Sequence, residues 1–302
     1  MKKILSALIG IVCISLSISV TADFSINSWV YQLQNTDYNQ LLSESYDLAV
    51  IDFQDSELSK QQIQSLQNQG KKVVSYLSIG EAEDYRNYWK EEWDKNPPSF
   101  LDEENPDWPG NYKVKYWNGY WKMIIMHQVD KIKSLGYDGV YLDIIDAYEY
   151  YEQKGREGAR IEMMDFVRQI AKRGRMKNEG FLVIPQNSPE LLVPKEVSEY
   201  SAKLSDKEKE ELKITKRYLS YIDGVGKEDT WYNDNISNNE ESIYWELKYL
   251  NLALSQGKFV LTIDYPTSLS LQCDFIQKSR EQRFVPFVSN RDLDTIPYVD
   301  CN

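Results

Sequence analysis

Carboxylates that follow a long apolar run are the residues of this sequence best suited to chemistry. The run Gly139-Val-Tyr-Leu-Asp143 ends in Asp143, and Asp146 follows three residues later. A continuous apolar run of this length is typical of a strand buried on both faces of a parallel sheet. Because a carboxylate is costly to bury without a partner or a task, Asp143 is a candidate for acid–base or nucleophilic chemistry. It then needs a partner carboxylate and a scaffold that holds both.

Acids and amides also stand at the ends of other strand-like runs. They are Asp52, Glu81, Asn187, Glu228, Asp264 and Asn290, with Glu83, Asp84 and Asp229 close by. An isolated Asp after a strand is commonly a helix N-cap, and we expect that role for Asp55 and Asp146. Together at one edge of a sheet, the other side chains would suit sugars, cations or acid–base chemistry. The single histidine, His127, lies in a helical pattern, so proton transfer falls to carboxylates or tyrosines.

Strand-like and helical segments alternate along the chain and predict the scaffold. The eight strand-like runs are 29–33, 48–52, 73–79, 139–143, 181–184, 222–226, 259–264 and 284–288. The helical patterns between them include 56–68, 117–135, 157–177, 239–255 and 269–282. Eight such repeats predict one α/β domain, a single (β/α)8 TIM barrel, whose active site would lie at the carboxyl ends of the strands. An open, doubly wound sheet is the alternative, because periodicity does not reveal closure.

Two connections are longer than a barrel requires. Residues 81–116, after the third strand, are rich in Trp, Tyr, Asp, Asn and Pro. We expect a long insertion there, at the end of the barrel where loops build the active site. The other connection, 185–218, ends in a run of mixed charge, 206–213, which is typical of a solvent-exposed helix.

The N-terminus has the composition of an export signal. Two lysines precede an apolar core, 4–20, and Val20-Thr-Ala22 supplies a small-residue cleavage site. We therefore expect residues 1–22 to be a signal peptide and residues 23–302 to be the mature domain. The apolar core is short for a membrane span and has no basic flank after it. The mature protein is then secreted or periplasmic, with no membrane partner.

Two cysteines remain in the expected mature domain, Cys273 and Cys301. In an oxidising compartment they could form a disulfide that holds the C-terminal tail, or they could stay as free thiols. Neither is close in sequence to another cysteine or to His127, so a zinc site of the usual kind is not expected.

Charge and motifs exclude several classes of protein. Removal of Lys2 and Lys3 with the signal leaves 33 basic residues against 47 acidic ones, a net charge of −14, which disfavours nucleic acid as a partner. No Gly-x-Gly-x-x-Gly or Walker loop follows a strand, and a Gly-x-Ser-x-Gly elbow is missing, so nucleotide cofactors and serine hydrolase chemistry lack support. Ca²⁺ or Mg²⁺ on the acids is an alternative, although no EF-hand-like loop is present. We expect no cofactor and no metal ion.

Aromatic residues favour a sugar as the ligand. They gather around the same strand ends and in the long connection: Trp29, Tyr31, Tyr85, Tyr88, Trp89, Trp93, Trp117, Trp121, Tyr148, Trp231 and Tyr232. A flat ring with a polar edge suits the apolar face and hydroxyl rim of a pyranose. Several of these rings would fill the core instead, and we expect this of Trp117 and Trp121, which have helical spacing.

Three segments resemble one enzyme family. They are Val74-Ser-Tyr-Leu-Ser-Ile-Gly-Glu-Ala-Glu-Asp-Tyr-Arg86, Leu135-Gly-Tyr-Asp-Gly-Val-Tyr-Leu-Asp143 and Asp223-Gly-Val-Gly-Lys-Glu-Asp229. The family is glycoside hydrolase family 114, the endo-α-1,4-polygalactosaminidases and their relatives, and the likeness extends over nearly the whole mature chain. The resemblance implies a secreted (β/α)8 enzyme that cleaves α-1,4-linked galactosamine polymers. Its partner would be a polysaccharide, cationic where the amines are free.

The resemblance also implies catalytic residues. Asp143 matches the acid after the fourth strand and Glu228 the acid after the sixth, although this last segment can also align through Asp229. Cleavage of a glycosidic bond needs one carboxyl group that protonates the leaving oxygen and another that attacks or activates water. We assign Asp143 as the nucleophile, by analogy with other barrel α-glycosidases, and Glu228 as the acid/base.

The remaining polar and aromatic residues at the strand ends would bind the substrate: Asp52, Glu81, Tyr141, Asn187, Trp231 and Asp264. Tyr76 is a weaker candidate, because it could simply fill the barrel core. The alternative function is a non-catalytic carbohydrate-binding or surface-assembly protein on a barrel scaffold. Complete acids after both the fourth and the sixth strand argue against this alternative.

Overall fold

The computed structural model describes two stretches of the chain, residues 25–193 and 206–301. The expected signal peptide, residues 1–22, lies outside the described residues and stays a prediction. Within the described stretches, every helix is too short or too polar to cross a membrane.

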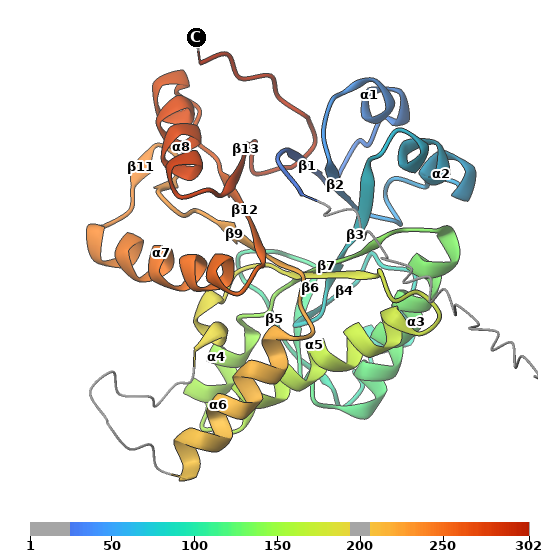
Figure 1. The fold of residues 1–302 in the computed structure, drawn as a ribbon. Coiled ribbons are helices and arrows are strands. Elements are labelled where there is room, and N and C mark those ends of the chain that lie inside the picture. The colour runs from blue at the N-terminus through green and yellow to red at the C-terminus, as the bar shows by residue number, and fades with distance from the viewer. Residues whose placement is uncertain (1–24, 194–205, 302) are drawn as a thin grey trace, which may run out of the picture.

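Among the described residues, eight parallel strands form the centre of the fold, and Figure 1 shows how they are arranged. In spatial order they are β1 (Trp29–Gln32), β2 (Leu48–Ile51), β3 (Lys72–Ser78), β7 (Gly139–Asp143), β8 (Leu182–Pro185), β9 (Gly224–Glu228), β12 (Phe259–Asp264) and β13 (Val285–Val288). Neighbours pair in parallel from β1 to β8 and from β9 to β13, and a parallel bridge between Gln186 and Gly226 connects the two groups. Each predicted strand run overlaps one of these strands.

Hydrogen bonds between the two ends of the chain close the barrel. The indole N–H of Trp29 in β1 donates to the carbonyl oxygen of Val285 in β13 at 2.9 Å. Just beyond these strands, the backbone N–H of Leu33 donates to the carbonyl oxygen of Leu293 at 2.7 Å. An open sheet would leave its first and last strands apart, so the predicted TIM barrel is confirmed and the doubly wound alternative is wrong.

Helices surround the strands, as Figure 1 shows. They are α1 (Tyr38–Ser43), α2 (Lys60–Asn68), α3 (Gly119–Leu135), α4 (Ala147–Gln153), α5 (Ala159–Arg175), α6 (Asp206–Leu219), α7 (Glu240–Ser255) and α8 (Leu269–Glu281), with the 3₁₀ helices η1 (Glu91–Asp94) and η2 (Pro189–Leu192). His127 is exposed on α3, on the outside of the barrel and away from the strand ends.

The helix starts differ in part from the predicted caps. The prediction that Asp55 caps a helix is wrong, because α2 begins after Ser59, whose side chain forms a capping box with Gln62. Asp146 occupies the N-cap position of α4, but its side chain makes no capping hydrogen bond.

Aromatic side chains fill the barrel interior. The ring centroids of Tyr31 and Tyr141 lie 5.2 Å apart, and Trp29 stacks on Tyr31 at 5.7 Å. The hydroxyl of Tyr141 lies against Gly226 in β9, where a Cβ atom would be 1.9 Å from the hydroxyl oxygen. Glycine is therefore required at this position of β9, because the tyrosine from β7 occupies the space that a side chain would fill.

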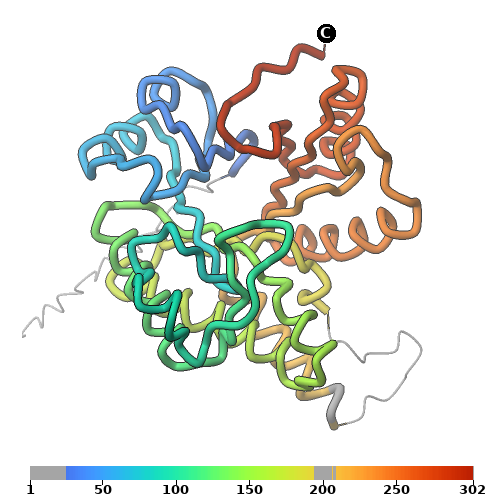
Figure 2. The backbone as a smooth tube through the Cα atoms, turned by 180° about the vertical axis from the view of Figure 1, so that it is seen from behind, coloured from blue at the N-terminus to red at the C-terminus, as the bar shows by residue number. Residues whose placement is uncertain are grey.

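The part of the chain that connects β3 to α3 forms a second, smaller sheet. Its strands β4 (Glu81–Glu83), β6 (Asn111–Val114) and β5 (Leu101–Glu104) pair antiparallel in that spatial order. Figure 2 shows this segment as the teal and green part of the tube, folded together on one side of the barrel. After β9, the short strands β10 (Tyr232–Asn233) and β11 (Ile236–Ser237) form a hairpin.

Aromatic rings stabilise the smaller sheet against the barrel. Trp93 packs edge-on against Phe100, with 5.4 Å between the ring centroids. The Phe100 centroid also lies 5.4 Å from that of Trp121 in α3. Trp121 is fully buried and donates its indole N–H to the carbonyl oxygen of Ile79 at 2.8 Å. Most of the aromatic residues of this segment thus serve its own core, as expected for Trp121.

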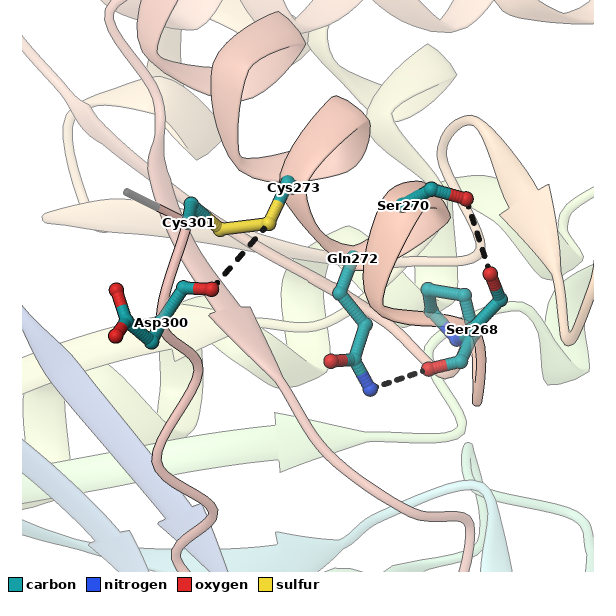
Figure 3. Close-up of a disulfide and its surroundings, with 7 residues drawn as sticks. Ser268, Ser270, Gln272, Cys273, Asp300 and Cys301 are labelled. Carbon is teal, nitrogen blue, oxygen red and sulfur yellow. Dashed lines mark hydrogen bonds between the residues drawn. A yellow bond between two sulfur atoms is a disulfide. The ribbon is translucent and has the colours of Figure 1, made fainter.

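A disulfide holds the C-terminal tail against the last helix. Cys301 is bonded to Cys273 in α8, with 5.4 Å between their Cα atoms (Figure 3). The tail that leaves Leu293 is therefore fixed at its far end as well as at the point where it closes the barrel. Of the two states left open by the sequence, the structure has the disulfide.

Replacement of both Cys273 and Cys301 by serine should lower the free energy of unfolding by roughly 2–4 kcal/mol. The bond joins residues that are 28 positions apart, so it removes substantial freedom from the unfolded chain. Guanidinium unfolding of the mature protein with and without reductant would measure the difference. The reduced wild type should match the double variant, and equal stability of all three samples would contradict this role.

Candidate active site

A cleft of about 780 Å³ opens at the carboxyl ends of the barrel strands. All eight strands or the loops that follow them contribute to its wall, in spatial order through Gln34, Asp52, Tyr76, Asp143, Asn187, Glu228, Tyr265 and Arg291. This is the end of a TIM barrel at which active sites are found. The sequence placed its candidate residues at the same end.

Asp143 ends β7 and is bonded to the neighbouring strand. The hydroxyl of Tyr76 in β3 donates to Oδ2 of Asp143 at 2.8 Å. Burial and, after it, the negative charge of Glu228 raise the pKa of Asp143 to about 8, and the hydrogen bond from Tyr76 opposes both effects only in part. The raised pKa keeps Asp143 protonated near neutral pH in the free protein.

Glu228 ends β9, which is separated from β7 by β8 alone. The hydroxyl of Tyr265 donates to its Oε1, and the side-chain amide of Asn187 donates to its Oε2 at 3.1 Å. Asn187 in turn accepts the backbone N–H of Glu228 at 3.1 Å, so the two residues are bonded twice. Burial raises the pKa of Tyr265 well above its ordinary value, so this hydroxyl stays a donor.

The structure also distinguishes Glu228 from its neighbour Asp229. Both carboxylate oxygens of Asp229 accept from the guanidinium of Arg291, each at 2.9 Å. A bidentate ion pair of this kind commits both oxygens of the carboxylate. Glu228 lines the cleft with Asp143, whereas Asp229 does not.

Two predicted acids line the cleft with partners of their own. Asp52 forms a salt bridge with Arg86, which also pairs with Glu83 at 2.5 Å. Glu81 accepts the side-chain amide of Asn105 at 2.9 Å through Oε1, and its buried Oε2 has no hydrogen-bond partner within the described part of the chain. Burial raises the pKa of Glu81. Each of these acids is therefore held in place before any ligand arrives.

Three predicted substrate-binding residues do not line the cleft. Tyr141 is fully buried in the barrel interior, although it lies near enough to Glu228 and Asp143 for their charges to add to the rise in its pKa that burial causes. Asp264 accepts three backbone N–H groups, from Thr230, Trp231 and Tyr232, at 2.8–2.9 Å. It fixes the loop after β9, and burial raises its pKa to about 6.

Trp231 lies in the core rather than in the cleft. Its ring centroid lies 5.8 Å from that of Phe275 in α8 and 6.2 Å from that of Phe284, and the side chain is almost completely buried. The bonds of Asp264 fold the backbone of this loop over the end of β12 and turn the indole toward the helices. No face of the Trp231 ring remains for a sugar.

Several residues of the cleft were not among the predicted site residues. Tyr265 and Arg86 bind predicted acids, and Trp108 lies in the wall. Tyr265 directly follows Asp264, so its place after a strand was a usable signal. Arg86 and Trp108 belong to the long connection, and the sequence alone does not predict which residues they contact. Within residues 25–193 and 206–301, no group of three or more His, Cys, Asp or Glu side chains is arranged to hold a metal ion.

Comparison of sequences gives one family and several relatives. The profile of glycoside-hydrolase family GH114 matches residues 18–301. Protein MJ1477 of Methanocaldococcus jannaschii, itself uncharacterised, is 39% identical over 285 residues, which cover 89% of this chain and 77% of the relative. An uncharacterised protein of Thermotoga maritima is 34% identical over 283 residues, which cover 89% and 82%.

Comparison of structures gives similar barrels. The glycoside hydrolase domain of PelA from Pseudomonas aeruginosa has a TM-score of 0.69 at 16% identity, and the match covers 92% of this chain and all of that domain. Ega3 of Aspergillus fumigatus, solved in complex with galactosamine, has a TM-score of 0.66 at 19% identity, with 89% and 92% covered. At these identities the likeness bears on the fold alone.

The raised pKa of Asp143 predicts how stability depends on pH. Its folded-state pKa of about 8 lies above the ordinary value, so the folded protein binds the extra proton between about pH 4 and pH 8. Stability is therefore lost as the pH rises through this window, and the cost is complete above about pH 8. Asp143→Asn, which stays neutral, should raise the Tm at pH 9 and change it little at pH 4.5.

Thermal unfolding at both pH values would measure this difference. The matched control is Asp107→Asn at an exposed position, which should shift the Tm equally at the two pH values. If Asp143→Asn also behaves in this way, the carboxyl group is not buried as described.

Proposed function

Because the chain belongs to glycoside-hydrolase family GH114 and is thus a glycoside hydrolase, we propose that it is a secreted, endo-acting enzyme that cleaves α-1,4-linked galactosamine-type polysaccharide. Asp143 and Glu228 are the proposed carboxyl pair. The observation that carries this proposal is that both groups line one cleft at the carboxyl ends of the strands, where burial and the charge of Glu228 raise the pKa of Asp143. Glycosidic cleavage needs such a pair, with one group charged and one protonated.

The contacts of each carboxyl group support the proposed roles. Asp143 acts as the nucleophile, and the hydrogen bond from Tyr76 stabilises its charged form. Glu228 acts as the acid/base, and Asn187 and Tyr265 fix its orientation. In the free protein, burial favours the protonated form of Asp143. A substrate amine next to Asp143 would lower its pKa, so that Asp143 would give up its proton and act as the charged nucleophile.

The charge of the cleft supports a cationic substrate. Two basic residues, Arg86 and Arg291, line it against eight acids: Asp52, Asp55, Glu81, Glu83, Asp143, Asp146, Glu228 and Asp292. A field of one sign attracts ligands of the other, so free amines would be drawn in and uronic acids repelled. Ega3, which has a similar fold, was solved with galactosamine, a sugar that carries such an amine.

A second hollow next to Glu228 supports endo action. This hollow of about 250 Å³ adjoins the cleft and includes Glu190 and Glu246 in its lining. Asp146, Asn187 and Glu228 line both spaces. A polymer that occupies both would have sugar residues on each side of the bond to be cleaved, as cleavage within a chain requires.

Export is supported by the disulfide and by the N-terminal sequence. Disulfides such as Cys273–Cys301 persist in oxidising compartments and are rare in the cytosol of mesophiles. Residues 1–22 have the composition of a signal peptide, with the cleavage site after Ala22. Secreted protein would then begin at Asp23.

Asp143→Asn and Glu228→Gln should each lower kcat on a galactosamine polymer by about 10²–10⁴-fold, because each removes one half of the acid–base or nucleophilic assistance. Reducing-end release would measure turnover, and circular dichroism would show that the fold is kept. Azide should partly restore activity to Asp143→Gly, in which a small nucleophile can take the place of the carboxylate.

Asp229→Asn is the comparison for Glu228→Gln, since Asp229 is the adjacent acid, is ion-paired with Arg291 and lines only the adjoining hollow. It should keep near-normal kcat. Loss of activity in Asp229→Asn together with normal turnover in Glu228→Gln would move the acid/base role to Asp229.

The proposed substrate charge makes a separate prediction. Partly deacetylated α-1,4-polygalactosamine should be cleaved with a higher kcat/KM than the fully acetylated polymer, and this advantage should shrink as salt rises. Attraction between exposed charges is screened over roughly 8–10 Å at 0.1–0.15 M ionic strength. Mass spectrometry of early products should give oligomers of mixed length. Equal rates on both polymers at all salt concentrations would contradict the electrostatic part, and release of single sugars alone would contradict endo action.

A further inference from the structure

Two large aromatic side chains lie exposed in the wall of the cleft. Trp108 is 59% exposed and Tyr85 is 64% exposed, although the other aromatic residues of this segment largely pack into its core. A tryptophan left in water forfeits the burial of one of the largest apolar surfaces that a side chain has. Its exposure in a cleft wall therefore needs a reason other than folding.

The backbone around Trp108 is held firmly. Trp108 lies in the turn between β5 and β6, where its N–H donates to the carbonyl oxygen of Asn105 at 3.2 Å and its own carbonyl oxygen accepts from Asn111 at 3.1 Å. The N–H of Asn105 also donates to the carbonyl oxygen of Asn111 at 2.7 Å, and the N–H of Gly110 donates to the Glu104 carboxylate at 2.8 Å. The turn is thus pre-formed before a ligand binds.

Two further bonds tie this turn to β4. The side-chain amide of Asn105 donates to Glu81 at 2.9 Å, and the N–H of Asp84 donates to the carbonyl oxygen of Gly110 at 2.9 Å. Gly110 has a φ of +89°, and a Cβ atom there would lie 2.9 Å from the Asp84 carboxylate. Glycine permits both the backbone conformation and the close approach.

The register of the small sheet places both aromatic residues at the same end. Glu83 of β4 pairs with Asn111 of β6, so Tyr85 and Trp108 continue from the same end of this pair of strands. The hydroxyl of Tyr85 donates to Glu83 at 2.8 Å, which limits the positions open to its ring. The sheet therefore presents two flat rings to one part of the cleft wall.

We propose that Trp108, with Tyr85 at the same end of the sheet, is a platform for one sugar ring of the polymer away from the bond that is cleaved. This inference rests on the proposed function and adds a binding position to it. The apolar face of a pyranose would pack on the indole. The platform belongs to the β4–β6–β5 sheet, whereas the carboxyl pair ends two barrel strands.

A contact of this kind acts on binding and not on the chemical step. Because it is the same in the bound substrate and in the transition state, its loss raises KM and leaves kcat nearly unchanged. The effect should also depend on substrate length, since an oligomer too short to reach Trp108 has no contact to lose.

The test compares Trp108→Ala, Trp108→Phe and the wild type on partly deacetylated polygalactosamine. Trp108→Ala should raise KM about five- to tenfold with kcat within about twofold of the wild type, and Trp108→Phe should keep most of the affinity because it keeps a ring. Trp245→Ala is the matched control, since Trp245 is 41% exposed on α7 and does not line the cleft. It should leave both constants unchanged.

Binding without turnover gives a second readout. In the Glu228→Gln background, Trp108→Ala should weaken retardation of the protein in a gel that contains the polymer. Unchanged KM and unchanged retardation in Trp108→Ala would overturn the platform while leaving the proposed function intact. A wild type that cleaves no galactosamine polymer would instead overturn the proposed function itself.

Discussion

The carboxyl groups of Asp143 and Glu228 repel each other in one largely buried space, and the neighbouring residues of the cleft must offset this repulsion. Asp143 ends β7 and Glu228 ends β9, and burial together with the charge of Glu228 raises the pKa of Asp143 to about 8. A fold can hold such a pair only if one group keeps its proton or if hydrogen bonds offset the desolvation. Both remedies are present, and both suit a glycoside hydrolase.

The barrel supplies those hydrogen bonds from strands on each side of the pair. Tyr76 donates to Asp143, while Tyr265 and Asn187 donate to Glu228. The aromatic packing below, with Tyr141 fitted against Gly226, keeps water from the barrel interior and so maintains the low polarity that couples the two groups. Fold and proposed chemistry thus depend on the same few side chains.

The sequence predicted the barrel and the main acids because these follow from short-range patterns. All eight strand runs were visible as apolar segments, and Asp143 and Glu228 stand at the ends of two of them. Trp231 was misplaced because its orientation depends on Asp264, whose three backbone hydrogen bonds turn the loop toward α8. Trp108 was not among the predicted site residues for a different reason. Nothing in the order of residues distinguishes an exposed aromatic in a long connection from its buried neighbours, since the difference arises from the antiparallel pairing of β4 with β6.

The most direct test of the central claim is the dependence of kcat/KM on pH, which reports the ionisation of the free protein. A fully acetylated galactosamine polymer is the appropriate substrate, because its sugars do not titrate and only the protein does. The proton that Asp143 holds up to about pH 8 predicts a kcat/KM that falls tenfold per pH unit above that value, as the pair of carboxyl groups loses its last proton. A kcat/KM that stays constant from pH 6 to pH 10 would show that no such proton is needed, and would contradict the account.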